Sequence, residues 1–172
     1  MKKDGIILLN KIKGISSFKA INQIKWNIGA SKIGHAGTLD PMAEGLMVVM
    51  VNSATKFSED LMKKDKEYYV EMELGYETDT YDAEGKKTKI YDGIIEYDEQ
   101  NVRDVINSFV GIQDQIPPMY SALKVNGRKM YEMAREGIEI VRKPRRVEIY
   151  SIRDITIKGQ MITFYVEVSS GT

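Results

Sequence analysis

The sequence predicts a domain of the α+β class, in which helices and mainly antiparallel strands are mixed in no regular order. Three observations favour this class. The chain has 172 residues, 42% of them hydrophobic and 29% charged, which suits one globular domain with a sizeable core. Segments with helical spacing and strand-like runs follow one another irregularly. Turn sequences such as Asn126-Gly127 predict tight hairpins rather than a regular series of helical crossovers.

Two buried strands separated by a helix are predicted for the first third of the chain. Residues 5–10 and 46–51 are continuously apolar, which is typical of strands covered on both faces. Between them, Ser16 or Ser17 can cap a helix that ends at Gly29. This helix carries apolar residues at helical spacing, namely Phe18, Ile21, Ile24 and Ile28.

Strands dominate the prediction for the rest of the chain. Residues 68–74 alternate in character and predict a half-buried strand, with one face formed by Tyr68, Val70, Met72 and Leu74. The other expected elements are a short helix over 53–62 with Phe57 and Leu61 inward, acidic turns over 75–98, a helix over 101–110 ended by Gly111, a short helix over 128–136, and two strands over 147–168.

Composition excludes several kinds of site. The chain has no cysteine, which rules out disulfide scaffolds and thiolate chemistry, and its single histidine argues against a structural zinc site. The apolar run near the N-terminus is too short for the core of a signal peptide, and no segment is long enough to span a bilayer. The expected location is therefore the cytoplasm.

Charge is balanced overall but unevenly distributed. The net charge of +0 argues against an indiscriminate nucleic-acid binder. Residues 1–66 carry 11 Lys or Arg against 6 Asp or Glu, residues 67–100 carry 3 against 11, and residues 101–146 carry 9 against 5. If the fold brings the two basic stretches together, they form a positive surface. The alternative is that each is an ordinary solvated face.

Aromatic residues are interleaved with the second basic stretch. Tyr120 and Tyr131 lie among basic residues that include Lys124, Arg128 and Lys129. This combination suits the phosphates and bases of a nucleic acid. An ordinary basic hairpin and helix on the surface would have the same composition.

Asp40 is the candidate reactive group. The twelve residues from Gly34 to Gly45 hold the only histidine, three glycines and an aspartate followed by proline. Glycine and proline together predict a stiff, tightly turned backbone, and functional groups are often presented on such loops. The alternative is that Asp40 caps a short helix with Pro41 at its first position. The two interpretations are compatible, because a capping backbone can still present a carboxylate.

Four segments of the chain, taken in order, carry a resemblance to one family. The segments are Leu8-Leu9-Asn10-Lys11 with Gly14-Ile15-Ser16-Ser17; Gly34 to Pro41 with Gly45; Lys66 to Val70 with Gly75, Thr78-Asp79-Thr80 and Asp82 to Gly85; and Gln115 to Lys124 with Gly127. Together they resemble the TruB-type pseudouridine-55 synthases of tRNA. The resemblance runs from about residue 5 to Thr172.

The resemblance implies an isomerase that converts uridine 55 in the T-arm of tRNA to pseudouridine, by detaching the uracil at N1 and rejoining it through C5. It implies that Asp40 is the nucleophile, attacking either the sugar C1′ or the uracil C6. It also implies that Tyr68 stacks on the flipped base and helps to remove the C5 proton. From the strand pattern alone, Tyr68 would be a core residue. Neither a metal nor an organic cofactor is implied.

RNA-binding residues are also implied by the resemblance. His35 matches a histidine that helps to hold the flipped nucleotides, and Lys11 matches a lysine near the active site. Residues 117–145, with Tyr120, Lys124, Arg128 and Lys129, match an insertion that closes over the bound RNA. The expected partner is the T-arm stem-loop of tRNA, with no membrane and no obligate protein partner.

The chain departs from the family in two places. Asn10 stands where an aspartate usually precedes the lysine. The Ser-x-Gly-Thr motif, matched by Ser169 to Thr172, is followed in the family by an arginine that pairs with the catalytic aspartate and later by a small RNA-binding domain. The expectation is therefore a partial pseudouridine-synthase catalytic domain over 1–172. Its sheet is mixed and mainly antiparallel, flanked by helices and incomplete at the C-terminus.

Two rival functions remain open at this stage. A non-catalytic module that binds or remodels the T-arm would share the RNA-binding features, and the early end of the chain favours it. A carboxylate-based hydrolase acting on a glycosidic bond would need a second carboxylate as general acid, for which Glu44 is the nearest candidate.

Overall fold

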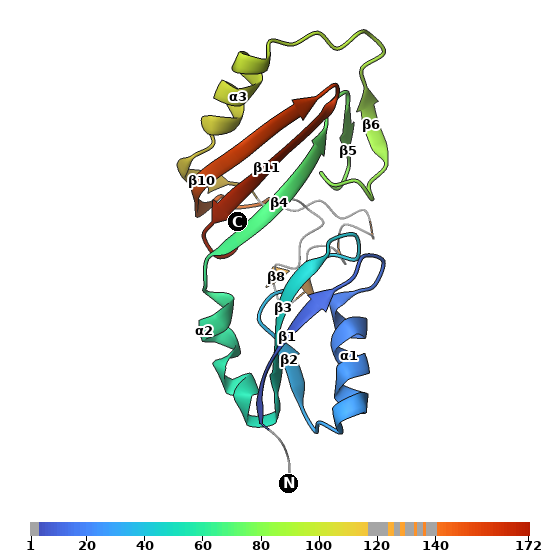
Figure 1. The fold of residues 1–172 in the computed structure, drawn as a ribbon, viewed down its shortest axis with the longest axis vertical. Helices are drawn as coiled ribbons and strands as arrows, with labels where there is room; N and C mark the ends of the chain where they lie inside the picture. Colours follow the sequence, from blue (N-terminus) through green and yellow to red (C-terminus); the bar gives the residue numbers. More distant parts are fainter. Residues whose placement is uncertain (1–3, 117–123, 126–127, 130–132, 134–135, 137–140) are drawn as a thin grey trace. The chain divides into compact units, whose positions relative to one another are not determined.

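The computed structural model describes residues 4–116, 124–125, 128–129, 133, 136 and 141–172. The chain divides into two compact units, Met1–Lys64 and Asp65–Thr172 (Figure 1). Each mixes helices with antiparallel strands, so the predicted α+β class is confirmed.

The first unit is a three-stranded antiparallel sheet with a helix on one face. The strand order is β1-β3-β2, so the last of the three strands in the chain is the central one. The elements of this unit are β1 Gly5–Lys11, α1 Ser17–Ile28, β2 Ile33–His35, β3 Gly45–Val51, the 3-10 helix η1 Asn52–Phe57 and α2 Ser58–Met62.

The core of this unit forms where α1 meets the sheet. Ile21 of α1 packs with Met47 and Val49 of β3, and Ile7 and Leu9 of β1 complete the same face. Fully burying such side chains contributes roughly 1.5–3 kcal/mol each. The other face of β1 is exposed, with Leu8 70% accessible to solvent. The strand bounds are confirmed, but the prediction that β1 is buried on both faces is wrong.

Helix α1 begins and ends where its local signals predict. Ser16 accepts a hydrogen bond from the Lys19 backbone N–H, and Gly29 adopts φ 63°, a left-handed conformation that glycine reaches without strain. Its buried face is narrower than the apolar pattern predicts, because only Ser17, Ala20 and Ile21 are buried. Phe18 and Ile28 are exposed.

The predicted helix over 53–62 forms as two short pieces, η1 and α2. Phe57, at the junction of these pieces, is about half exposed rather than turned inward. Only Ala54 of this segment is buried. A 3-10 helix has fewer residues per turn than an α-helix. A prediction that assumes one α-helix over 53–62 therefore places Phe57 on the wrong side of the segment.

The second unit is a four-stranded antiparallel sheet in the order β4-β11-β10-β7. Helix α3 packs against β10, with Ile106 buried and the Arg103 side chain donating a 2.6 Å hydrogen bond to the Ile155 carbonyl. The elements of the sheet and helix are β4 Lys66–Glu73, α3 Glu99–Asn107, β7 Gly111–Gln115, β10 Arg145–Lys158 and β11 Met161–Val168.

The acidic stretch contains a hairpin that the sequence did not predict. Strands β5 Tyr76–Thr78 and β6 Lys87–Ile90 pair within it. Its turn is held by carboxylates that accept backbone N–H groups, from Lys86 to Asp79 and from Glu84 to Asp82. The predicted acidic turn is therefore present, and two of its carboxylates form part of the turn itself.

Two predictions near the C-terminal half need correction. Helix α3 ends at Asn107, three residues before the predicted end. Residues 128–129 form strand β9, Arg128–Lys129, paired with β8, Lys124–Val125, rather than the start of a helix. The opposition of Val125 and Arg128 is the register that a two-residue connection produces. Asn126 and Gly127 themselves lie outside the described residues.

Candidate active site

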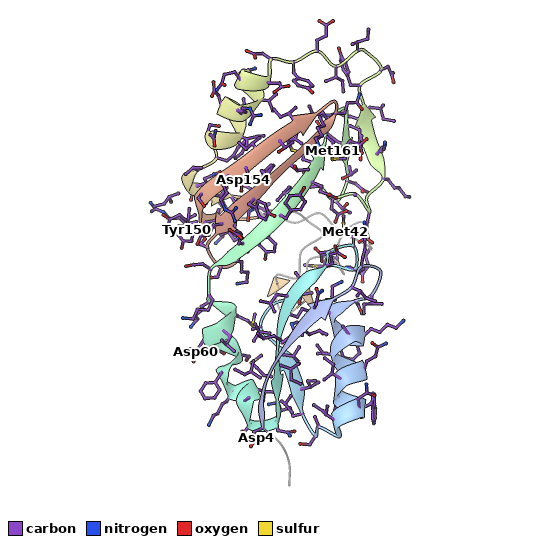
Figure 2. All side chains as sticks on the ribbon, viewed as in Figure 1. Asp4, Met42, Asp60, Tyr150, Asp154 and Met161 are labelled. Carbon is purple, nitrogen blue, oxygen red and sulfur yellow. The ribbon has the colours of Figure 1, made fainter. Side chains whose placement is uncertain are left out.

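Asp40 lies on the loop between β2 and β3, where its side chain is exposed. The backbone N–H of Ala43 donates a 3.1 Å hydrogen bond to the Asp40 carbonyl, which closes a turn. No helix follows Pro41, so the helix-cap alternative is not what the structure shows. Met42, on this turn, is labelled in Figure 2 at the end of the first unit opposite Asp4.

Ser17 holds the backbone immediately before Asp40. Its hydroxyl accepts a hydrogen bond from the Leu39 N–H at 2.9 Å and donates one to the Leu39 carbonyl at 2.7 Å. Ser17 is buried in the first turn of α1. One side chain therefore satisfies both backbone groups of the residue next to the carboxylate.

Lys11 holds the backbone immediately after Asp40. Its side chain is 1% exposed, and the ammonium donates to the carbonyls of Ile12 at 3.1 Å, Ile15 at 2.9 Å and Pro41 at 3.3 Å. The Gly14 N–H donates to the same Pro41 carbonyl at 2.8 Å. Lys11 is thus not a solvated strand end, and its ammonium acts on the protein's own backbone. Its contact with RNA stays a prediction.

His35 ends β2 and braces the start of the loop. Its Nδ1 lies 2.7 Å from the Gly37 carbonyl. A carbonyl can only accept, so Nδ1 carries the hydrogen, and Nε2 of a neutral ring is left as an acceptor. The ring is half-buried, and the next residue, Ala36, is tied to the Val48 carbonyl at 2.9 Å.

Tyr68 belongs to the second unit, on β4 opposite Val166 of β11. Its side chain is 38% exposed, although it shares a face with the half-buried Val70 and Met72. It is therefore more accessible than the core position that the strand pattern alone suggests. Asp40 therefore belongs to the first unit and Tyr68 to the second.

The other predicted RNA-binding residues lie in or beside the gaps of the structure. Tyr120 is outside the described residues, as is most of the predicted insertion over 117–145. Lys124 is placed in β8, and Arg128 and Lys129 in β9, by their backbone alone. Their role at the site stays a prediction.

Ser17 is the functional residue that sequence reasoning missed. A helix needs one N-cap, and Ser16 supplies it. The sequence signal for this role was the second serine of the pair, Ser17. A hydroxyl at the start of a helix that is not needed as the cap can bind the backbone of another segment.

Removing this hydroxyl by Ser17→Ala is expected to destabilise the chain by about 1–2 kcal/mol, since the Leu39 N–H and carbonyl lose their shared partner. Amide hydrogen exchange at Leu39 should accelerate. The matched control is Ser16→Ala, which costs about 1 kcal/mol through loss of the cap but leaves Leu39 protected. Equal exchange at Leu39 in both variants would contradict the assignment.

Among the described residues, no three His, Asp or Glu side chains gather in a way that could hold a metal ion. Within the same residues, no helix is both long and apolar enough to cross a membrane.

The site is thus an exposed carboxylate on a backbone-braced turn of an α+β unit, and Asp40 is its candidate reactive group. The model of the TruB family pseudouridylate synthases, N-terminal domain, matches residues 25–172. The chain therefore belongs to the TruB family of pseudouridylate synthases, which confirms the resemblance inferred from the four sequence segments.

Relatives and solved structures agree with this membership. The chain is 46% identical to tRNA pseudouridine synthase B of Fusobacterium nucleatum subsp. nucleatum and 43% identical to that of Clostridium kluyveri. Each match covers 98% of this chain and 58% of the relative, so the chain spans little more than half of their length. A solved Cbf5-Nop10-Gar1 complex contains a chain with a TM-score of 0.72 and 28% identity, matched over 98% of this chain and 40% of that one.

Proposed function

We propose that this chain is the catalytic part of an RNA-modifying isomerase that converts uridine 55 in the T-arm of tRNA to pseudouridine. The observation that carries the proposal is the exposed Asp40, with the backbone bound on both sides by Ser17 and Lys11. Membership of the TruB family and relatives named tRNA pseudouridine synthase B support the same reaction.

The reaction needs a nucleophile, and Asp40 is suited to that role. A carboxylate is ionised at neutral pH and needs no base to activate it. In the proposed reaction the bond between uracil N1 and C1′ breaks, and a bond between C5 and C1′ forms. The proton lost from C5 is balanced by one gained at N1. Attack by Asp40 at C1′ or at C6 is compatible with this balance.

The bracing of the loop supplies the positioning that such a reaction needs. A misplacement of about 1 Å in a reacting group can cost on the order of a hundredfold in rate. Hydrogen bonds to Leu39 and Pro41 restrain the chain on either side of the carboxylate. The backbone on either side of the proposed nucleophile is therefore held in place before RNA binds.

Roles for the other candidates follow from their environments. The target base must leave its stack to be reached, and Tyr68 is proposed to stack on it and to help remove the C5 proton. His35 is proposed to hold the flipped nucleotides through Nε2, because Nδ1 is occupied by Gly37. Residues 117–145 are proposed to close over the RNA, with their lysines and arginines on its phosphates.

The expected absence of an obligate protein partner and the cytoplasmic location stay predictions. The solved Cbf5 structure is a complex with Nop10 and Gar1, and that composition describes Cbf5. We propose the T-arm stem-loop as the partner of this chain.

The test is to incubate the chain with a T-arm stem-loop and to analyse the nucleosides of the RNA. Pseudouridine at the target position is the expected product. Free uracil would instead indicate a glycosidic hydrolase, and RNA that is bound but unchanged would indicate a binding module. A stem-loop with cytidine at the target position is the matched control, and it should yield no modified nucleoside.

A further inference from the structure

Helix α1 exposes two aromatic side chains that lie outside the described core of the first unit. Trp26 is 79% exposed and Phe18 is 71% exposed, on a helix whose buried face is formed by Ser17, Ala20 and Ile21. Large aromatic side chains usually contribute to cores or to interfaces. The two exposed rings therefore do not serve the stability of the first unit, and their position calls for another explanation.

The two aromatic residues belong to one ridge on the helix. Phe18, Asn22 and Trp26 follow one another at steps of four residues, so their side chains are neighbours along the side facing away from the core. Eight residues of α-helix span about 12 Å. Lys19 and Lys25 flank the ridge on its two sides, because they lie one residue after Phe18 and one before Trp26.

The stretch of sequence that contains this ridge carries charge of a single sign. Residues 11–39 contain five lysines and no aspartate or glutamate. Lys11 is used within the protein, whereas Lys13, Lys19 and Lys32 are exposed. A stretch of this length without an acidic side chain favours a polyanionic ligand over a neutral one.

The ridge begins beside the candidate active-site loop. Phe18 directly follows Ser17, whose hydroxyl binds both backbone groups of Leu39, the residue before Asp40. From there α1 runs away from the loop toward the other end of the first unit (Figure 1). A strand of RNA with one nucleotide at Asp40 can therefore continue along the helix.

We infer that the outward ridge of α1 is an RNA-binding surface, on which bases stack on Phe18 and Trp26 while Lys19 and Lys25 contact phosphates. The inference rests on the proposed function, since it assigns the ridge to the same RNA. Aromatic platforms combined with lysines match the two features of a nucleic-acid strand, its bases and its phosphates. An acidic protein segment would use the lysines but would leave both rings without a stacking partner.

Trp26 reports on this surface directly, because it is the only tryptophan in the chain. The experiment is a titration of the 172-residue chain with an unmodified tRNA transcript while tryptophan emission is recorded. We expect saturable quenching of Trp26, with a midpoint equal to the dissociation constant measured by filter binding. Unchanged emission at saturating RNA would overturn the inference.

Substitutions measure what the surface contributes. Trp26→Ala is expected to weaken tRNA binding about fivefold to tenfold, and Trp26→Phe, which keeps an aromatic face, by no more than about twofold. Lys19→Gln should lower the slope of log affinity against log salt by about one. The matched control is Tyr91→Ala, an exposed aromatic residue in the acidic stretch, which should leave affinity unchanged.

Thermal unfolding of each variant excludes misfolding as the cause, since an exposed ring contributes little to stability. Equal affinities for Trp26→Ala and Tyr91→Ala would overturn the inference. Tryptophan emission that changes with protein concentration alone would also overturn it, because the ridge would then bind a second copy of the chain. Quenching by polyglutamate equal to quenching by tRNA would overturn it as well. A nucleoside assay on the same samples separates the two proposals: quenching without pseudouridine contradicts only the proposed reaction, and pseudouridine without quenching contradicts only the ridge.

Discussion

Asp40→Asn is expected to abolish pseudouridine formation, with a rate loss on the order of 10⁴-fold or more. The amide keeps the shape of the carboxylate but lacks the charge that makes it a nucleophile. Because Asp40 is exposed and the bracing hydrogen bonds belong to its neighbours, the fold should be unaffected. RNA affinity should change by less than about tenfold, or roughly 1.4 kcal/mol. The measurement is single-turnover formation of pseudouridine in a T-arm stem-loop, beside a binding titration.

Glu44→Gln is the matched control for this prediction. Glu44 is an exposed carboxylate four residues further along the same loop, and it would be the general acid if the chain were a glycosidic hydrolase. As an isomerase, the chain should retain its activity in this variant. Near-normal turnover by Asp40→Asn would end the assignment of the nucleophile.

Lys11→Met is expected to destabilise the chain by about 2–3 kcal/mol and to slow turnover on the order of a hundredfold. The ammonium is buried and donates to three carbonyls, so its loss leaves those three acceptors without this donor. Methionine fills a similar volume, which separates the loss of hydrogen bonds from the creation of a cavity. Denaturant unfolding measures the stability, and the nucleoside assay measures turnover.

Lys13→Met is the matched control, since Lys13 is exposed two residues further along the chain. Its substitution should change stability by less than about 0.5 kcal/mol. If the two variants were equally stable, the three hydrogen bonds of Lys11 would not be what holds the Asp40 loop.

Several parts of the fold could be predicted because their signals are local. The start of α1 at Ser17 and its end before Gly29 follow from an N-cap and a left-handed glycine, each decided by a few neighbouring residues. The two strands predicted over 147–168 are present as β10 and β11. The Asp40 turn was recognised from its glycines and proline for the same reason.

Other features depend on residues far apart in the sequence and were misjudged. Leu8 and Phe18 are apolar and fit their predicted elements, yet both are exposed. The reason is that the sheet and α1 pack against each other over one narrow surface, which includes neither residue. The hairpin of β5 and β6 lies in the stretch that the sequence predicts only as acidic turns. Its carboxylates bind backbone N–H groups up to seven residues away, which composition does not reveal.

The sequence by itself determined the family of this protein and the residue proposed to react, because the family follows from four short segments along the chain and the residue from the motif around Asp40. Only the tertiary structure decided how that residue is held. The Lys11 ammonium reaches the Pro41 carbonyl across 30 positions of the chain, and Ser17 reaches Leu39 across 22. Such contacts form only when β1, α1 and the loop have packed together. A lysine that a sequence pattern places at a solvated strand end is then buried, because packing adds the Pro41 carbonyl to the neighbouring carbonyls of Ile12 and Ile15 that its ammonium binds.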